Sequence, residues 1–236
     1  MSEMKQQAQD ASLVLGTEDI LTSLCNSVSK VLGVATQSRV HYSGMVQRIT
    51  RTCLKPDIGC FVLFDGGFSG LVVLNFSSAA AMELYQTYML SMGMPESSLS
   101  HSHTSDEVGN IMGELMNQIV GDFTGKVRRE LQTNITQNQP KMLVLNKQVV
   151  LSVDTQLDQP EIRRVTFYTA RNNIFYLELA IDRTEFIRLR DFVAEEEIDP
   201  DEVIAQAAAQ NTAQGAAPAP KAEQDDHEAL LKSLGM

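Results

Sequence analysis

Four residues within one predicted helix carry the types and spacing best suited to chemistry: Asn110, Glu114, Asn117 and Gly121. At 100° per residue they fall on one face, within roughly 60° of each other. An asparagine amide can orient a water molecule but cannot act as a strong general base. A glycine on the same face lets the backbone of another protein come close. The pattern indicates either a positioning site used with a partner or an ordinary solvated helix face.

The helix that must position these side chains is the longest one predicted, over residues 105–135. Thr104 with Glu107 three residues later fits a capping box at its start. The face opposite the polar residues carries an apolar stripe that should pack against a core. The stripe consists of Val108, Ile111, Met112, Leu115, Ile119 and Phe123.

The segment from Gly113 to Gly121, GELMNQIVG, resembles the signature helix of the CheC/CheX/FliY group of chemotaxis phosphatases. The pattern of that group is Glu-x-x-Asn, with Gly four residues and Pro twenty-three residues after the Asn; Gly121 and Pro140 stand at those positions. The group prefers Asp or Ser four residues before the Glu, where this chain has Asn110. The resemblance extends over residues 15–192. A single signature helix makes it closer to CheX than to two-site CheC.

A second Glu-x-x-Asn lies one heptad earlier, at Glu107 and Asn110. It has Glu114 where the glycine should be and Thr133 where the proline should be. The capping box already gives Glu107 a role. Glu114 and Asn117 are therefore the favoured pair.

The end of the chain carries a separate resemblance, to the C-terminal CheY-binding helix of CheZ. An acidic pair precedes a leucine-rich face, and acidic residues suit the N-terminus of a helix. Met236 stands where the CheZ pattern ends in an aromatic residue. An ordinary frayed terminus is the alternative. The residues expected to bind the partner are Asp225, Asp226, Leu230, Leu231, Leu234 and Met236.

These resemblances imply an enzyme that dephosphorylates the phosphoaspartate of a CheY-like response regulator. Asn117 would orient the attacking water, and Glu114 would pair with the lysine of the regulator's active site. Mg²⁺ is expected on the regulator, and no cofactor or metal of the chain's own is expected. The alternative is a non-catalytic CheX-like adaptor or a flagellar switch component. A homodimer is a further expectation from CheX.

The composition excludes several other classes of function. A net charge of −11 argues against a nucleic-acid binder, which needs a Lys/Arg surface. No apolar run approaches the ~18 residues of a membrane span, and the N-terminus does not read as a signal peptide, so a cytoplasmic location is expected. His101 and His103 lie in a polar connector without further metal ligands at a suitable spacing. The three cysteines are expected to be free, buried thiols.

Around the long helix, the pattern predicts an α/β (α+β) domain with a mostly antiparallel sheet packed against helices. Helices are expected from Thr17, over 78–92 and near 184–192. Strands are expected over 40–51, 58–66, 71–74, 142–153, 162–170 and 173–182, with glycines 66 and 67 in a hairpin turn.

Four segments follow along the chain. Residues 1–14 are expected to be a disordered N-terminus, and residues 15–192 the CheX-like domain. Residues 193–222 are acidic and then rich in Ala, Gln and Pro, which is typical of a flexible linker. Residues 223–236 form the predicted amphipathic partner-binding helix.

Overall fold

The computed structural model describes residues 14–145, 147 and 149–187. The chain divides into two units, Met1–Ala194 and Glu195–Met236, and the described residues all belong to the first. Residues 1–13 of the predicted disordered N-terminus, the predicted linker and the predicted C-terminal helix lie outside the described residues. No helix within the described ranges is long and apolar enough to span a membrane.

An antiparallel sheet of seven strands forms the centre of the fold. Its order is β2-β9-β10-β5-β4, and β6 and β7 both pair with the outer edge of β4. Every residue of the central strand β5 is buried, because both faces of the sheet are covered. The strands are β2 (His41–Arg48), β4 (Ile58–Gly66), β5 (Gly70–Phe76), β6 (Ile135–Gln137), β7 (Lys141–Val144), β9 (Pro160–Tyr168) and β10 (Ile174–Asp182).

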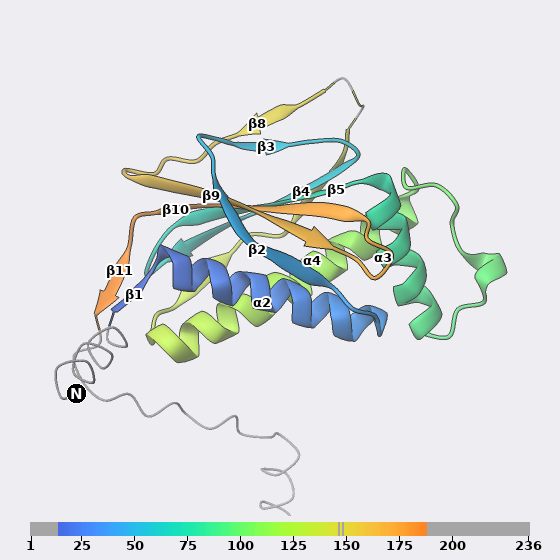
Figure 1. Cartoon of the computed structure of the whole chain (residues 1–236), viewed down its shortest axis with the longest axis horizontal. Helices are drawn as coiled ribbons and strands as arrows, with labels where there is room; N and C mark the ends of the chain where they lie inside the picture. Colours follow the sequence, from blue (N-terminus) through green and yellow to red (C-terminus); the bar gives the residue numbers. More distant parts are fainter. Residues whose placement is uncertain (1–13, 146, 148, 188–236) are drawn as a thin grey trace, which may run out of the picture. The chain divides into compact units, whose positions relative to one another are not determined.

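Three helices cover one face of this sheet: α2 (Thr17–Thr36), α3 (Ser78–Ser91) and α4 (Asp106–Leu131) (Figure 1). The main core lies between them and the sheet, and alternate residues of each strand point into it. The α4 residues Met112, Leu115, Ile119 and Phe123 are all buried there, as the apolar stripe predicts. The opposite side of α4 is left facing outwards.

The other face of the sheet is covered by a small antiparallel pair, β3 (Thr52–Leu54) and β8 (Leu151–Val153) (Figure 1). Leu54 packs on Leu71 and Val73 of β5 in a second apolar cluster. Two buried polar side chains also hold β3 in place. Glu178 accepts a hydrogen bond from the Cys53 backbone N–H at 2.9 Å, and Asn75 Nδ2 donates to the Cys53 carbonyl at 2.8 Å.

Most predicted elements are confirmed, and four predictions are wrong in detail. The strand expected over 142–153 is two short strands, since β7 pairs with β4 and β8 pairs with β3. The long helix ends at Leu131 rather than 135, because Gln132 adopts a left-handed conformation (φ 49°) and the chain turns into β6. The segment expected to begin a helix near 184 instead forms β11 (Glu185–Ile187), since it pairs with β1 (Val14–Gly16). Val14, predicted to be disordered, belongs to that β1 strand.

Candidate functional site

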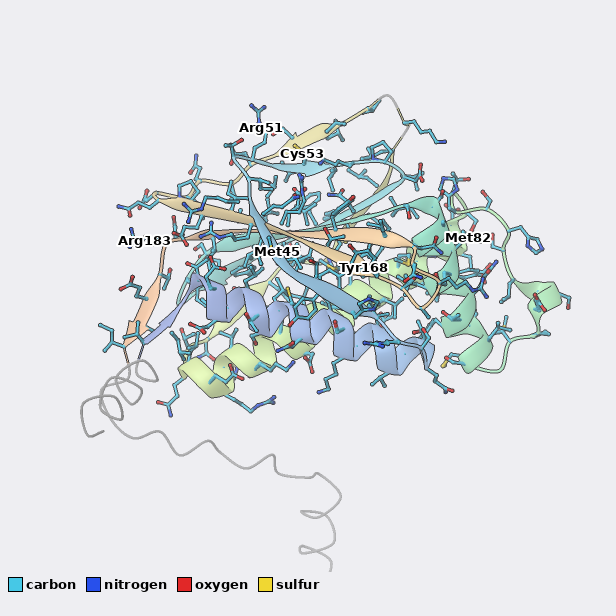
Figure 2. All side chains as sticks on the ribbon, in the orientation of Figure 1. Met45, Arg51, Cys53, Met82, Tyr168 and Arg183 are labelled. Carbon is cyan, nitrogen blue, oxygen red and sulfur yellow. The ribbon has the colours of Figure 1, made fainter. Side chains whose placement is uncertain are left out.

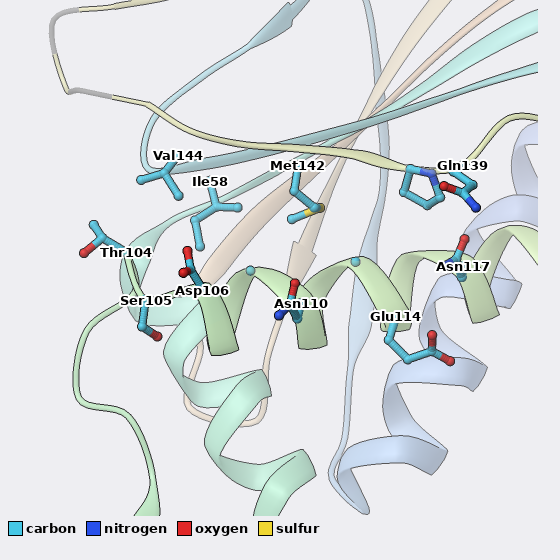
Figure 3. A pocket seen from close by; sticks show the side chains of 13 residues that line it. Ile58, Thr104, Ser105, Asp106, Asn110, Glu114, Asn117, Gln139, Met142 and Val144 are labelled. Atoms are coloured by element: carbon cyan, nitrogen blue, oxygen red, sulfur yellow. The ribbon is translucent and has the colours of Figure 1, made fainter.

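An open groove of about 720 Å³ runs between the outward face of α4 and the β6–β7 segment (Figure 3). Three of the residues singled out on α4 line it, namely Asn110, Glu114 and Asn117. Pro140 lines the opposite wall, so the structure brings the Glu-x-x-Asn pair and the distant proline to one place. Gly121 is exposed on the same helix but does not line the groove.

The spacing of Asn117 and Pro140 follows from element geometry. From Asn117 to Leu131 the helix advances about 21 Å, at roughly 1.5 Å per residue. After the turn, the extended chain returns about 20 Å between Asn134 and Pro140, at roughly 3.3 Å per residue. The two distances match, so a proline twenty-three residues beyond the asparagine lies across the groove from it.

The turn that reverses the chain is held by two glycines. A Cβ on Gly66 would lie 2.1 Å from the Asn134 carbonyl oxygen, and one on Gly67 would lie 1.7 Å from Thr133 Oγ1. Gly66 also has a φ of +154°, which L side chains rarely adopt. Both positions therefore require glycine, and their role includes close packing against the end of α4 as well as the predicted hairpin.

The opposite wall of the groove is held by Asn138, in the gap between β6 and β7. Its Oδ1 accepts a hydrogen bond from the Leu63 backbone N–H at 2.9 Å, and its own N–H donates to the Leu63 carbonyl at 3.1 Å. The side chain thus replaces a missing rung of the β4 ladder. Gln139 and Pro140 stand immediately beyond it and face α4.

Asn117 and Glu114 point in different directions from α4. In Figure 3, Asn117 points toward Gln139 across the groove, while Glu114 points to the other side of the helix. Both side chains are exposed, and Glu114 Oε1 accepts a hydrogen bond from Gln118 Nε2 at 3.0 Å. The amide and the carboxylate are therefore both accessible to an approaching macromolecule.

The second Glu-x-x-Asn pair has a structural role at its glutamate. Burial, together with a hydrogen bond to Glu107, raises the pKa of the Tyr85 phenol. The Tyr85 oxygen also accepts a hydrogen bond from the Ser100 backbone N–H at 3.0 Å. Glu107 thus helps to fix the connector that precedes α4. This supports Glu114 and Asn117 as the functional pair.

The predicted capping box is wrong by one residue. Ser105 rather than Thr104 caps α4, and its Oγ accepts a hydrogen bond from the Val108 backbone N–H at 3.3 Å. Thr104 instead hydrogen bonds with Ser102. Thr104 would have capped the Glu107 N–H, whereas Ser105 caps the next one, that of Val108. Serine and threonine are both common N-cap residues, so residue type alone could not separate the two choices.

The position of α4 depends on Asp122, which lies between α4 and α2. Its carboxylate contacts Lys30 of α2 at 3.0 Å and Lys126 of α4 at 2.8 Å. Burial by itself would raise the pKa of Asp122. Hydrogen bonds from Lys126, Ser27 and Lys30 outweigh that effect and lower the pKa to about 2.

This ion pair predicts a specific pH dependence of stability. A depressed carboxyl pKa stabilises the fold above the unfolded-state pKa, and the contribution is lost as the pH falls toward about 2. Asp122→Asn should lower the free energy of unfolding at pH 7 by about 2 kcal/mol. Urea denaturation should show the difference from wild type shrinking between about pH 4 and pH 2. Asp154→Asn, at an exposed position, is the matched control; an equal loss there would contradict the assignment.

The side chains that line the groove can form hydrogen bonds, and none of them is a cysteine nucleophile. Burial raises the pKa values of the Cys25 and Cys60 thiols to about 12, so neither is a thiolate at neutral pH. Among the described residues, no group of three His, Cys, Asp or Glu side chains could hold a metal ion. The arrangement can position a reacting group supplied by something else.

Sequence reasoning missed part of the groove wall. Ile58, Gln139, Met142 and Val144 line it without belonging to the Glu-x-x-Asn pattern. A signal existed for Gln139, which precedes Pro140. A strand over 142–153 was predicted, but no periodicity in the sequence reveals that β7 lies opposite α4. The predicted tail residues, from Asp225 to Met236, lie beyond the part of the chain that the structure describes.

Residues 11–236 match the sequence pattern of a family described as "Protein of unknown function (DUF3334)". The chain belongs to the DUF3334 family. No protein with a curated description matches this DUF3334 chain.

Solved structures similar to the DUF3334 chain are chemotaxis proteins. The CheX of Desulfovibrio desulfuricans has a TM-score of 0.56 at 15% identity, over 70% of this chain and 99% of that one. The CheX of Vibrio vulnificus has a TM-score of 0.57 at 13% identity, over 70% and 99%. A CheX-CheY-BeF3-Mg²⁺ complex from Borrelia burgdorferi has a TM-score of 0.50 at 14% identity, over 70% and 98%. The DUF3334 chain therefore has the CheX fold, as its sequence predicts.

Proposed function

We propose that this protein binds a phosphorylated CheY-like response regulator and removes the phosphoryl group from its aspartate. One observation carries the proposal: exposed Glu114 and Asn117 stand on the rim of an open groove whose far wall holds Pro140. The CheX fold supports it, because one protein of that fold forms a complex with CheY. The resemblance of the signature helix supports it independently.

In this mechanism the chain positions the attacking water and the docked regulator. The regulator supplies the aspartyl phosphate, a Mg²⁺ and a lysine, so most of the charge stabilisation belongs to the partner. Asn117 inserts its amide beside the phosphoryl group and holds a water in line with the leaving carboxylate oxygen. Glu114 leaves Gln118 and pairs with the regulator's lysine. A carboxylate that is worth little on an open surface contributes more once an interface excludes water.

The tail from Asp225 to Met236 would capture the same regulator. The Ala/Gln/Pro-rich part of the predicted linker is residues 205–222, and a flexible chain of that length would span roughly 23 Å root-mean-square at 5–6 Å × √n. Such a tether gives effective concentrations near the millimolar range. In this proposal the tail recruits the regulator, and the residues of the groove act on its phosphoryl group.

The test is the decay of labelled phosphoryl groups on a CheY-type regulator from the same organism, with and without the wild-type protein. Faster decay that rises with protein concentration supports a phosphatase. Unchanged decay, with binding shown by calorimetry, would make the protein a non-catalytic adaptor instead. Unchanged decay without binding would exclude the regulator altogether.

Gly121 provides a prediction in which stability and function change in opposite directions. It is exposed, and a Cβ placed there meets nothing within 4 Å, so the chain's own packing does not require glycine. Gly121→Ala should stabilise the protein by about 0.5–1 kcal/mol, because alanine favours the helix. The same change should weaken regulator binding several-fold, since it blocks close approach of the partner's backbone. Thermal unfolding and titration calorimetry measure the two effects; unchanged affinity would remove Gly121 from the interface.

A further inference from the structure

The exposed stripe of α4 is too small to hold a protein partner alone. From Asn110 to Gly121 it is about 17 Å long, at roughly 1.5 Å per residue, and about 10 Å wide. That is roughly 170 Å², whereas a stable interface buries about 800 Å² on each partner. A regulator that docks on Glu114 and Asn117 must therefore also cover one of the flanks of α4.

The flank next to Glu114 holds a hollow of about 350 Å³ between the C-terminal ends of α2 and α3, which we call the apolar hollow. Figure 1 shows these two helix ends beside each other. Val34 and Met92 are 72% and 68% exposed there, among the most exposed large apolar side chains described. Exposed apolar patches of this kind mark interaction surfaces. The residues that line the hollow and matter here are Lys30, Val31, Val34, Tyr88, Met92 and Gln118.

Gln118 joins this hollow to the candidate site. It lines the hollow, and its Nε2 donates the 3.0 Å hydrogen bond to Glu114 Oε1. A partner seated in the hollow therefore touches a residue that holds the carboxylate.

The flank on the other side of α4 differs in chemistry. The groove there has apolar side chains on its β4 and β7 wall, but its other lining side chains are mostly polar and hydrogen bond well to water, as Asp106, Asn110 and Gln139 do. Binding energy concentrates where apolar side chains are fully desolvated at the centre of an interface. The apolar hollow is the flank that gains more from being covered.

We propose that the response regulator covers the apolar hollow, where Val34 and Met92 set its affinity, while Asn117 governs the chemical step. This inference rests on the proposed function and names the second half of the same docking surface. Apolar side chains of the regulator pack between Val34 and Met92. Methionine suits this role because its flexible thioether adapts to the partner's shape.

The test uses the full chain with Val34→Glu and Met92→Glu together. The dissociation constant for the phosphorylated regulator should rise at least tenfold, and the rate of dephosphorylation at saturating protein should stay within a factor of two. Met45→Glu is the matched control, since Met45 is 80% exposed on the edge strand β2 (Figure 2). It should change neither quantity. The thermal unfolding midpoints of the variants, compared with that of the wild type, check that the fold persists.

The possible outcomes separate this inference from the proposed function. An unchanged dissociation constant in the double variant overturns the inference, even if Asn117→Ala abolishes activity. A changed molecular mass in light scattering, with regulator affinity intact, assigns the hollow to a second copy of the chain and also overturns it. Weaker binding in the double variant, with no dephosphorylation by wild type, keeps the docking surface and rejects only the phosphatase activity.

Discussion

Asn117→Ala should lower the stimulated rate of regulator dephosphorylation by at least about 100-fold, because in the proposed mechanism the amide orients the attacking water. The alanine methyl group cannot hydrogen bond to the water, so the water is no longer held in line with the leaving carboxylate oxygen. The side chain is exposed and contributes no core contact, so the stability of the protein should not change measurably. Loss of phosphoryl label under single-turnover conditions measures the effect directly.

Asn110→Ala is the matched control for this variant. Asn110 is the same residue type on the same face of α4, is also exposed and lines the same groove two turns earlier. Its replacement should change the rate by less than a factor of about three. If Asn110→Ala costs as much as Asn117→Ala, the groove as a whole and not one amide matters, and the catalytic assignment fails.

Glu114 should behave differently from Asn117. Glu114→Ala removes the charge proposed to pair with the regulator, so the concentration needed for half-maximal rate should rise more than the maximal rate falls. The structure gives a reason for this separation, since Asn117 points into the groove and Glu114 points out of it (Figure 3). Equal losses in both parameters would indicate that the two residues act as one unit.

The helix and its polar face were predictable because both depend on local spacing. Apolar residues at Met112, Leu115 and Ile119 follow the 3.6-residue period, which places Asn117 outward without knowledge of the rest of the fold. The β4–β5 hairpin was predictable for the same reason, as alternating strands around glycines. The opposing position of Pro140 needed the family resemblance, since a twenty-three-residue separation has no local signature.

The remaining features depend on contacts between distant segments. β11 exists because Phe186 pairs with Leu15 across the length of the chain, and nothing near Phe186 favours a strand over the expected helix. The β3–β8 pair covers the second face of the sheet through Leu54 and the buried Glu178. In the sequence, a glutamate within an apolar strand is as consistent with an exposed position as with a buried one. The role of Glu178 follows only from the partners that the structure gives it.

That buried anchor should make a large contribution to stability. Glu178 is 0% exposed, and its Oε1 lies 2.8 Å from Arg164 while its Oε2 accepts the Cys53 N–H at 2.9 Å. Glu178→Ala leaves a guanidinium without its carboxylate and a backbone N–H without an acceptor. The expected loss is about 3 kcal/mol, at the lower end of the range for breaking buried ion pairs, because Arg164 retains partial access to water.

Denaturant unfolding of full-length variants measures this loss, and two further variants define its cause. Glu185→Ala removes an exposed carboxylate 3.8 Å from Arg183 and should cost less than about 0.5 kcal/mol. The double change Glu178→Met with Arg164→Met should recover the part of the loss that comes from the unpaired charge, while the Cys53 N–H remains without its acceptor. Because β3 lies on the face of the sheet opposite α4, the folded fraction of Glu178→Ala should keep its activity toward the regulator. A loss in the double variant as large as in Glu178→Ala would mean that the Cys53 hydrogen bond or packing, and not the unpaired charge, makes Glu178 indispensable.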